Sequence, residues 1–222
     1  MNNFKALMAS SDQPESLGFA LRNRRFQVFE DLINKNFPEE KTIHILDVGG
    51  TAYFWEDKNM VLEGRVKVTL LNLEEEYNLP FGIDSISGDA TDLSQFEDNE
   101  FDLVFSNSVI EHLYTWKNQK KMAKECMRVG KKFFIQTPNK HFLVEAHYAL
   151  PFIQYAPKKL AFMVLTKTKI SRMRKWKEKD AQQYLDEIRL INEKEMAKLF
   201  PGANIYKEKW LGMTKSFTSH NL

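Results

Sequence analysis

The sequence has little cysteine, little net charge and no long apolar run. Its single cysteine, Cys126, excludes an internal disulfide framework and fits a reducing compartment. Residues 1–10 lack the apolar core and the small-residue cleavage site of a secretory signal. Nowhere do about 18 apolar residues follow one another, the length that a spanning helix needs. The sequence therefore predicts a cytoplasmic protein without a transmembrane segment.

The formal net charge of +2 is too small to indicate a nucleic-acid partner by itself. The length of 222 residues suits a single α/β domain over 1–222, which can bury a full core. Within it we expect an N-terminal helical cap over 1–40 and an insertion over 139–191 that interrupts the regular pattern. There is no internal repeat and no low-complexity tract.

Apolar runs that read as strands alternate with stretches that read as helices. The alternation implies βαβ units and a mostly parallel sheet with helices on both faces. A tight connection through Gly212 makes the last two strands antiparallel. The expected strands are one that begins at Ile43, then Val66–Leu73, Ile83–Ser87, Phe101–Ser106, Lys132–Thr137, Ala203–Trp210 and Thr214–His220.

Helices are expected wherever apolar residues recur at helical spacing between a capping residue and a breaker. Ser11 or Asp12 is a candidate cap for the first helix, and Gly130 ends a later one. Asn192 and Glu195 have the spacing of a capping box. The expected helices are Pro14–Asn36, Tyr53–Val61, one that ends at Val129, Lys158–Asp180, and one from Asn192 to Phe200.

Two basic helical stretches each leave two interpretations open. Arg22, Arg24 and Arg25 lie together on the first helix, either as a solvated face or as arginines held over an anionic group of a ligand. The helix expected over Lys158–Asp180 is apolar and basic. It either covers the site as a solvated helix or contacts a membrane surface or an acidic substrate.

Small or polar residues follow four of the expected parallel strands. They are Asp47 with Gly49 and Gly50, then Asn72, Asp89, and Ser106 with Asn107. Ligands of open α/β sheets bind beyond the carboxyl ends of the strands, and glycines directly after a strand let the backbone approach a ligand closely. The sequence therefore predicts a nucleotide-type cofactor site at this edge of the sheet.

The order of these motifs resembles the class I S-adenosylmethionine-dependent methyltransferases, in particular the broad group related to the ubiquinone-biosynthesis enzymes. The resemblance runs from about Thr42 to the C-terminus. It rests on the stretches Ile45–Gly50, Gly88–Ala90, Phe101–Asn107, Val109–Leu113, Gln136–Asn139, Leu199–Gly202 and Gly212–Ser216. It implies a Rossmann-like seven-stranded sheet with an antiparallel last strand, and S-adenosylmethionine as cofactor.

The resemblance also implies roles for individual residues, which we carry over as expectations. Asp47, Gly49 and Gly50 would frame the methionine part of the cofactor, and Asn72 with Leu73 would meet the ribose. Asp89 and Ala90 would meet the adenine, and Ser106 with Asn107 would line the methyl-transfer side. Two departures stand out. Thr51 occupies the place of a further glycine, and Asn72 occupies the place of an acidic residue, for which Glu74 is a candidate substitute.

Methyl transfer needs a general base only where the acceptor must lose a proton. The stretch after the fifth strand offers His141, Glu145 and His147, and His112 is a further candidate. The spacing of His141, Glu145 and His147 is not a familiar zinc spacing, so we predict no metal site there. Local hydrogen bonding that fixes the loop is an equally open interpretation of these residues.

The sequence thus predicts an enzyme that methylates a small-molecule acceptor, with the 139–191 insertion as a substrate lid. The aromatic and basic insertion suits an amphipathic or anionic metabolite and leaves peripheral membrane contact open. One alternative is a non-enzymatic S-adenosylmethionine-binding module. A nicotinamide-dependent oxidoreductase is disfavoured because the G-x-G-x-x-G spacing is absent. A nucleic-acid substrate is disfavoured because no basic domain is present, and the sequence favours no oligomeric state.

Overall fold

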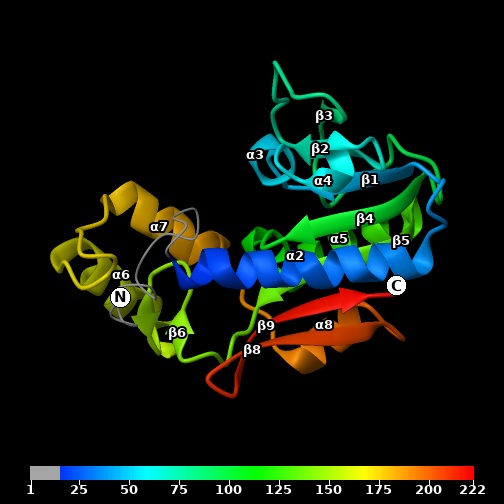
Figure 1. Ribbon diagram of the computed structural model, residues 1–222. Coiled ribbons are helices and arrows are strands. Elements are labelled where there is room, and N and C mark those ends of the chain that lie inside the picture. The colour runs from blue at the N-terminus through cyan, green and yellow to red at the C-terminus, as the bar shows by residue number, and fades with distance from the viewer. Residues whose placement is uncertain (1–15) are drawn as a thin grey trace.

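The computed structural model describes residues 16–222, and Figure 1 shows their arrangement. The expected cap at Ser11 or Asp12 and the expected helix start at Pro14 lie outside these residues. The chain forms a seven-stranded sheet in the order β3-β2-β1-β4-β5-β9-β8. Its strands are β1 (Ile43–Val48), β2 (Val66–Asn72), β3 (Ile83–Ser87), β4 (Phe101–Asn107), β5 (Gly130–Pro138), β8 (Asn204–Trp210) and β9 (Met213–His220).

The sheet is parallel from β3 to β5, and β9 runs antiparallel to both of its neighbours. The predicted fold class, a Rossmann-like mostly parallel sheet with an antiparallel last strand, is therefore confirmed. The strand order reverses between β1 and β4, where Asp47 pairs with Phe105. Such a switch point opens a crevice at the carboxyl ends of the two strands, which is where α/β sheets bind their ligands.

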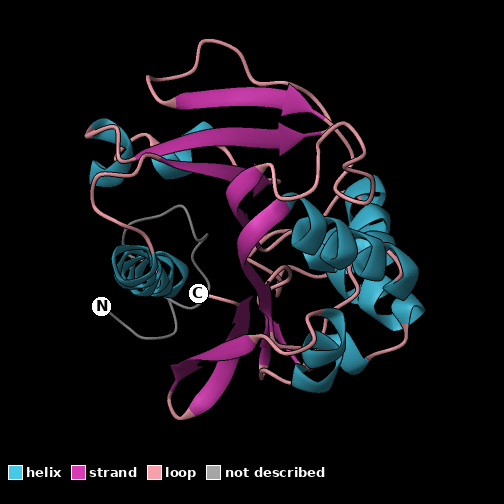
Figure 2. Cartoon of the chain, turned by 90° about the vertical axis from the view of Figure 1, so that its right-hand side faces the viewer, coloured by secondary structure: helices cyan, strands magenta, loops and turns pink. Residues whose placement is uncertain are grey.

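Helices cover both faces of the sheet, as Figure 2 shows. One face carries α2 (Leu17–Asn36), α3 (Ala52–Trp55) and α4 (Asn59–Leu62), and the other carries α5 (Trp116–Val129) and α8 (Glu193–Leu199). On the first face, Phe29 and Trp55 are fully buried against the aromatic ring of Phe105. On the second, the apolar stripe of α5 packs together with α8. These aromatic rings form part of the core on this face of the sheet.

The helix expected over Tyr53–Val61 is two short helices, α3 and α4, separated by residues 56–58. The capping box expected at the start of α8 is present. The Asn192 side chain accepts a hydrogen bond from the Glu195 N–H, and the Glu195 side chain accepts one from the Asn192 N–H. Gly130 ends α5 as expected and at once begins β5.

Residues 139–191, which we call the insertion, form a separate layer beyond the carboxyl ends of β4 and β5 (Figure 1). They contain the short strands β6 (Val144–Glu145) and β7 (Leu150–Pro151) and the helices α6 (Lys158–Lys167) and α7 (Glu178–Glu187). Their two ends lie side by side, because the Lys140 N–H donates to the Ile191 carbonyl over 3.0 Å. The insertion has its own buried cluster, made of Tyr148, Leu150, Ala161, Leu165, Trp176, Ala181 and Leu185.

The single helix expected over Lys158–Asp180 is wrong, because the chain leaves the helical conformation at Thr168 and resumes it at Glu178. Tertiary contacts hold the break. The Ser171 hydroxyl is fully buried, donates to the Tyr148 carbonyl over 2.7 Å, and accepts from the Trp176 indole N–H over 2.8 Å. This buried network orders the link between α6 and α7 and overrides the helical periodicity of the sequence.

Candidate active site

The turn after β1 fits only glycine at two successive positions. Gly49 has φ of +77°, and a Cβ there would lie 2.6 Å from a methyl group of Val109. A Cβ on Gly50 would lie 1.7 Å from Oδ2 of Asp47. The two glycines therefore let the backbone fold directly against the Asp47 carboxylate. A turn alone would not require so close an approach.

Asp47 is a buried carboxyl group with one unused oxygen. Its side chain is 1% exposed, and its Oδ2 accepts a hydrogen bond from the Trp55 indole N–H over 2.7 Å. Its Oδ1 is buried without a partner. Burial raises the pKa of Asp47 to about 7, the Trp55 hydrogen bond opposes the rise, and the charge of Glu76 adds to it. An unpartnered buried oxygen is a position where a bound cationic group gains most.

Asn72 is turned toward the glycine turn. Its Nδ2 donates to the Gly50 carbonyl over 2.8 Å, which leaves its Oδ1 as the acceptor it offers to a ligand. The carboxylate near this turn is Glu76, whose Oε2 accepts from the Ala52 N–H over 3.4 Å. Glu74, the candidate from the sequence, is exposed, and Glu76 is a second candidate because it contacts the turn. Leu73 is 81% exposed.

The other predicted cofactor residues lie on two neighbouring strand ends. Asp89 is exposed, and its Oδ1 accepts from the Thr91 N–H over 2.7 Å in the turn that follows β3. That turn is tied to the end of β2 through the Gly88 N–H, which donates to the Asn72 carbonyl over 2.7 Å. Ala90 is half-buried beside it. The loops after β1, β2 and β3 are therefore connected by hydrogen bonds.

The end of β4 lies between this edge and the insertion. The Ser106 hydroxyl is fully buried and donates to the Val48 carbonyl over 2.8 Å, so it ties β4 to β1 and is not free for a ligand. Asn107 keeps a buried Oδ1 without a partner. Ser108 has φ of +60° and donates through its hydroxyl to Oε1 of Gln136 over 2.8 Å. Sequence reasoning missed Ser108 and Gln136 as site residues.

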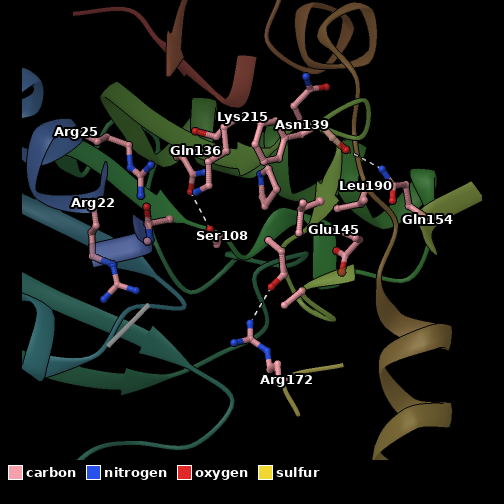
Figure 3. Close-up of a pocket in the computed structure, with 18 residues that line it drawn as sticks. Arg22, Arg25, Ser108, Gln136, Asn139, Glu145, Gln154, Arg172, Leu190 and Lys215 are labelled. Atoms are coloured by element: carbon pink, nitrogen blue, oxygen red, sulfur yellow. Dashed lines mark hydrogen bonds between the residues drawn. The ribbon is translucent and has the colours of Figure 1, made fainter. Parts of the chain in front are cut away.

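A cavity of about 260 Å³ opens beside Asn107 and Ser108 and is closed on its outer side by the insertion (Figure 3). We call it the rim cavity. Arg22 and Arg25 approach it from α2, whereas Glu145 and Gln154 approach from the insertion. Its polar lining consists of Arg22, Arg25, Asn107, Ser108, Gln136, Asn139, Glu145, Gln154, Arg172, Lys215 and Ser216, and its larger apolar lining residues are Phe142, Val144 and Leu190.

The charge of the rim cavity is mostly positive. Four cationic side chains line it, against Glu145 as the acidic one. Arg25 is held by Glu208, whose Oε2 accepts from its guanidinium over 2.7 Å. Burial lowers the pKa of Lys215, the charge of Glu208 opposes this, and the neighbouring charges of Arg25 and Arg22 lower it further. Arg22 and Arg25 therefore both line the cavity, Arg25 as part of a buried ion pair, whereas Arg24 is exposed.

Three of the four predicted catalytic residues come together, and one of them, Glu145, lines this cavity. Oε1 of Glu145 accepts from Nδ1 of His147 over 2.6 Å, and the Nε2 atoms of His147 and His112 lie 3.1 Å apart. Oε1 of Glu187 accepts from Nδ1 of His112 over 2.8 Å. His141 lies apart, exposed, with its Nδ1 2.9 Å from the Tyr155 hydroxyl.

Glu111 completes this cluster, although the sequence analysis quoted it in a motif without giving it a role. It is fully buried, its Oε2 accepts from the Thr137 hydroxyl over 3.0 Å, and its Oε1 has no partner. Burial raises the pKa of Glu111 despite the nearby histidines. Burial lowers the pKa of His147, but the charge of Glu145, its hydrogen bond and the charge of Glu111 outweigh this and raise it.

Comparison with known proteins agrees with the fold. Residues 61–133 match the family model of a methyltransferase domain. A search of curated proteins finds no match. Many solved structures are similar in fold. One is an S-adenosylmethionine-dependent methyltransferase from Methanosarcina mazei, with 14% identity, a TM-score of 0.51, and coverage of 85% of this chain and 95% of that one.

A second similar structure is the CurJ carbon methyltransferase, with 11% identity, a TM-score of 0.55, and coverage of 91% of this chain and 54% of that one. A third, from Galdieria sulphuraria, is named as a candidate sarcosine dimethylglycine methyltransferase, with 24% identity, a TM-score of 0.42, and coverage of 54% of this chain and 48% of that one. This chain thus spans about half the length of these two matches. Residues 61–133 thus match a methyltransferase domain, and the whole fold is similar to that of S-adenosylmethionine-dependent methyltransferases.

The residues at the sheet edge fit this cofactor at its methionine end. The glycine turn leaves no side chain over the backbone, and the unused Oδ1 of Asp47 suits the cationic α-amino group. The acceptor oxygen of Asn72 and the nearby Glu76 lie beside this turn, where the resemblance leads us to expect an acidic residue. Within residues 16–222, no helix has the length and apolar character needed to cross a membrane.

Proposed function

We propose that this protein transfers the methyl group of S-adenosylmethionine to an anionic, partly apolar small molecule held in the rim cavity. The observation that carries the proposal is the position of that cavity. It begins at Asn107 and Ser108, where the resemblance puts the methyl-transfer side of the cofactor, and its wall is mostly cationic. Cofactor and acceptor would therefore meet at the end of β4.

The cofactor supplies a methyl group that its sulfonium already activates, so the protein mainly has to align the acceptor and exclude water. Asp47, Gly49 and Gly50 would hold the methionine end. Asn72, with Glu76 beside it, would meet the ribose, and Asp89 with Ala90 would meet the adenine. Asn107 would offer its unpartnered Oδ1 at the boundary between cofactor and acceptor.

The lining supports an anionic acceptor with an apolar portion. Arg22, Arg25, Arg172 and Lys215 surround the cavity, and Glu145 is the acidic residue in its wall. A charge-assisted hydrogen bond to a carboxylate or phosphate is stronger than a neutral one, and arginine suits both groups. Phe142, Val144 and Leu190 would contact the apolar portion of the acceptor.

Glu145 is the candidate base for acceptors that must lose a proton. It lines the rim cavity, and its carboxylate is held by the His147 ring and by the Tyr148 N–H, which donates over 2.8 Å. His147 would share the proton as a positioning residue, with His112 behind it. His141 neither lines the cavity nor contacts the other three residues, since its Nδ1 lies 2.9 Å from the Tyr155 hydroxyl, which makes it the weakest of the four predicted candidates.

We propose further that the insertion is the substrate lid and that its outer surface contacts anionic membranes, where amphipathic acceptors gather. Leu160, Met163, Ile170 and Met173 are between 47% and 83% exposed, and lysines flank them along α6 and the following loop. Such a mixture suits an anionic interface. Sedimentation with phosphatidylserine vesicles tests it. Binding that Met163→Glu does not weaken, or equal binding to phosphatidylcholine vesicles, would count against it.

The main experiment measures S-adenosylhomocysteine formation with matched acceptor pairs, each a carboxylate or phosphate and its neutral ester. We expect turnover of anionic members and an increase in KM of about 10-fold or more in Arg22→Gln, from the loss of a charged hydrogen bond. Arg24→Gln is the matched control, because Arg24 lies on the same helix but is exposed and does not line the cavity. Equal effects of the two variants, or turnover of neutral acceptors alone, would contradict the anionic assignment. Cofactor binding without turnover of any acceptor would favour the non-enzymatic alternative.

A further inference from the structure

Two histidines and a carboxylate from distant parts of the chain converge beside the rim cavity. Glu111 and His112 lie on η1 (Ile110–His112), directly after β4, and His147 lies in the insertion between β6 and β7. One ligand atom from each of the three lies within 4.8 Å of the other two. The two Nε2 atoms are only 3.1 Å apart.

The hydrogen bonds of the two Nδ1 atoms determine whether the two Nε2 atoms carry a proton or a lone pair. An ionised carboxylate only accepts hydrogen bonds, so Nδ1 of His112 donates to Glu187 and Nδ1 of His147 donates to Glu145. Two neutral rings with protonated Nδ1 atoms then direct the lone pairs of both Nε2 atoms at each other. A contact of 3.1 Å between two lone pairs requires a positive charge between them, either a proton on one ring or a metal ion.

The surroundings of Glu111 favour a metal ion over a proton between the two rings. It is fully buried, and its Oε1 has no partner although its Oε2 is satisfied by Thr137. A proton shared between His112 and His147 leaves this buried oxygen unsatisfied, which is costly. A cation bound by all three residues satisfies it, and a divalent ion offsets most of the negative charge of Glu111, Glu145 and Glu187.

We propose that Glu111, His112 and His147 bind a divalent transition-metal ion of the zinc type, with a fourth position open to water. Two imidazoles and one carboxylate are a familiar ligand set for such ions. Bond lengths of about 2.0–2.1 Å in a tetrahedral site put ligand nitrogens about 3.3 Å apart, close to the separation found here. The Glu111 carboxylate closes the remaining gap by a side-chain rotation.

The groups behind these ligands have the arrangement that metal sites use to orient histidines. Each ring donates its other N–H to a carboxylate, His112 to Glu187 and His147 to Glu145, and Thr137 holds the second oxygen of Glu111. Because His147, Glu145 and Glu187 belong to the insertion, the metal joins the insertion to the sheet edge. It thereby fixes the Glu145 wall of the rim cavity.

The sequence spacing gives no indication of this site. Glu111 and His112 are adjacent and His147 follows 35 residues later, a pattern without a familiar zinc spacing. The sequence analysis predicted no metal and considered His141, Glu145 and His147 as the possible ligand set. The structure leaves His141 outside the cluster, turns Glu145 into a supporting residue, and brings in Glu111 and His112.

The test titrates chelator-stripped protein with Co²⁺ and then displaces Co²⁺ with Zn²⁺, without cofactor or acceptor. We expect one equivalent to bind, with the intense visible absorption of a tetrahedral Co²⁺ site. His112→Gln and His147→Gln should each weaken binding about 100-fold or more, and Glu187→Gln about 10- to 100-fold. His44→Gln is the control and should bind like the wild type, because His44 is exposed on β1.

Either of two results would overturn the proposal. One is the failure of folded wild-type protein to bind one equivalent saturably, with no Zn²⁺-dependent increase in its melting temperature. The other is unchanged affinity in the folded His112→Gln/His147→Gln double variant. Circular dichroism establishes folding for every variant. If one histidine variant does not fold, the metal affinity of the other histidine variant and of Glu111→Gln is measured in its place. Since the readout is metal binding, failure of the proposed methyl transfer leaves this test unaffected.

Discussion

The raised pKa of Asp47 predicts how the stability of the protein without ligand changes with pH. Its folded-state pKa is raised to about 7, from an ordinary value of 3.8 that also applies to the unfolded chain. The folded protein therefore holds a proton on Asp47 that the unfolded chain releases. The resulting stability is fully present below the unfolded pKa and is lost as the pH rises through about 7.

The magnitude follows from the two pKa values. Between pH 5 and pH 9, the linkage relation gives a loss of about 2–3 kcal/mol of the free energy of unfolding from Asp47 alone. Asp47→Asn removes this titration and keeps the shape of the side chain. The new amide leaves an N–H group facing the unpartnered side, which costs about 1–3 kcal/mol at every pH and so cancels in the pH difference.

The assay is urea denaturation of the wild type and Asp47→Asn at pH 5, 7 and 9. We expect the stability of the variant relative to the wild type to improve by about 2–3 kcal/mol from pH 5 to pH 9. Asp102→Asn is the control. Burial favours a higher pKa for Asp102, but hydrogen bonds from Lys41, His44 and Lys131 lower it, so it stays ionised over this range. The difference in the free energy of unfolding between Asp102→Asn and the wild type should therefore not change with pH.

A flat profile for Asp47→Asn would refute the reasoning, because Asp47 would then be ionised in both states throughout. A second arm tests the cofactor role of this residue. Saturating S-adenosylhomocysteine should reduce the pH dependence of the wild type, because its cationic α-amino group favours the ionised carboxylate. If the pH dependence of stability is unchanged by bound ligand, Asp47 does not contact the cofactor, although its raised pKa in the folded protein would still stand.

Three further predictions concern single sites. Gly50→Ala should weaken cofactor binding at least 10-fold by calorimetry, because its Cβ would lie 1.7 Å from Asp47; Gly64→Ala, with open space around it, is the control and equal losses in both would contradict the argument. Arg25→Met should destabilise the fold by about 1–3 kcal/mol in urea titrations, because buried Oε2 of Glu208 loses its partner while Oε1 keeps Ser216 and Lys215; unchanged stability would contradict this. Cys126 is buried with its pKa raised to about 12, so thiol reagents should label it at pH 8 only after denaturation; rapid labelling of folded protein would be the opposite result.

Some features of the site were predicted from sequence for physical reasons that are local. A carboxylate followed by two glycines predicted a tight turn, and Gly50 does lie against Asp47. The contact of this turn with a ligand stays a prediction. The capping box at Asn192 needs only residues three positions apart, so the sequence was sufficient to predict it. By contrast, the position of Glu76 beside the turn depends on how the loop after β2 folds back onto Ala52, which no local pattern encodes.

The sequence by itself determined the seven strands, their mostly parallel order and the antiparallel last strand, because apolar runs and turn residues act over a few neighbouring positions. The tertiary structure alone decided the partners of the charged groups. Arg25 meets Glu208 across 183 positions, and His112 meets Glu187 across 75. Only the folded sheet and insertion bring such groups within hydrogen-bond distance. Burial there removes the water that would otherwise make each charge independent of its neighbours.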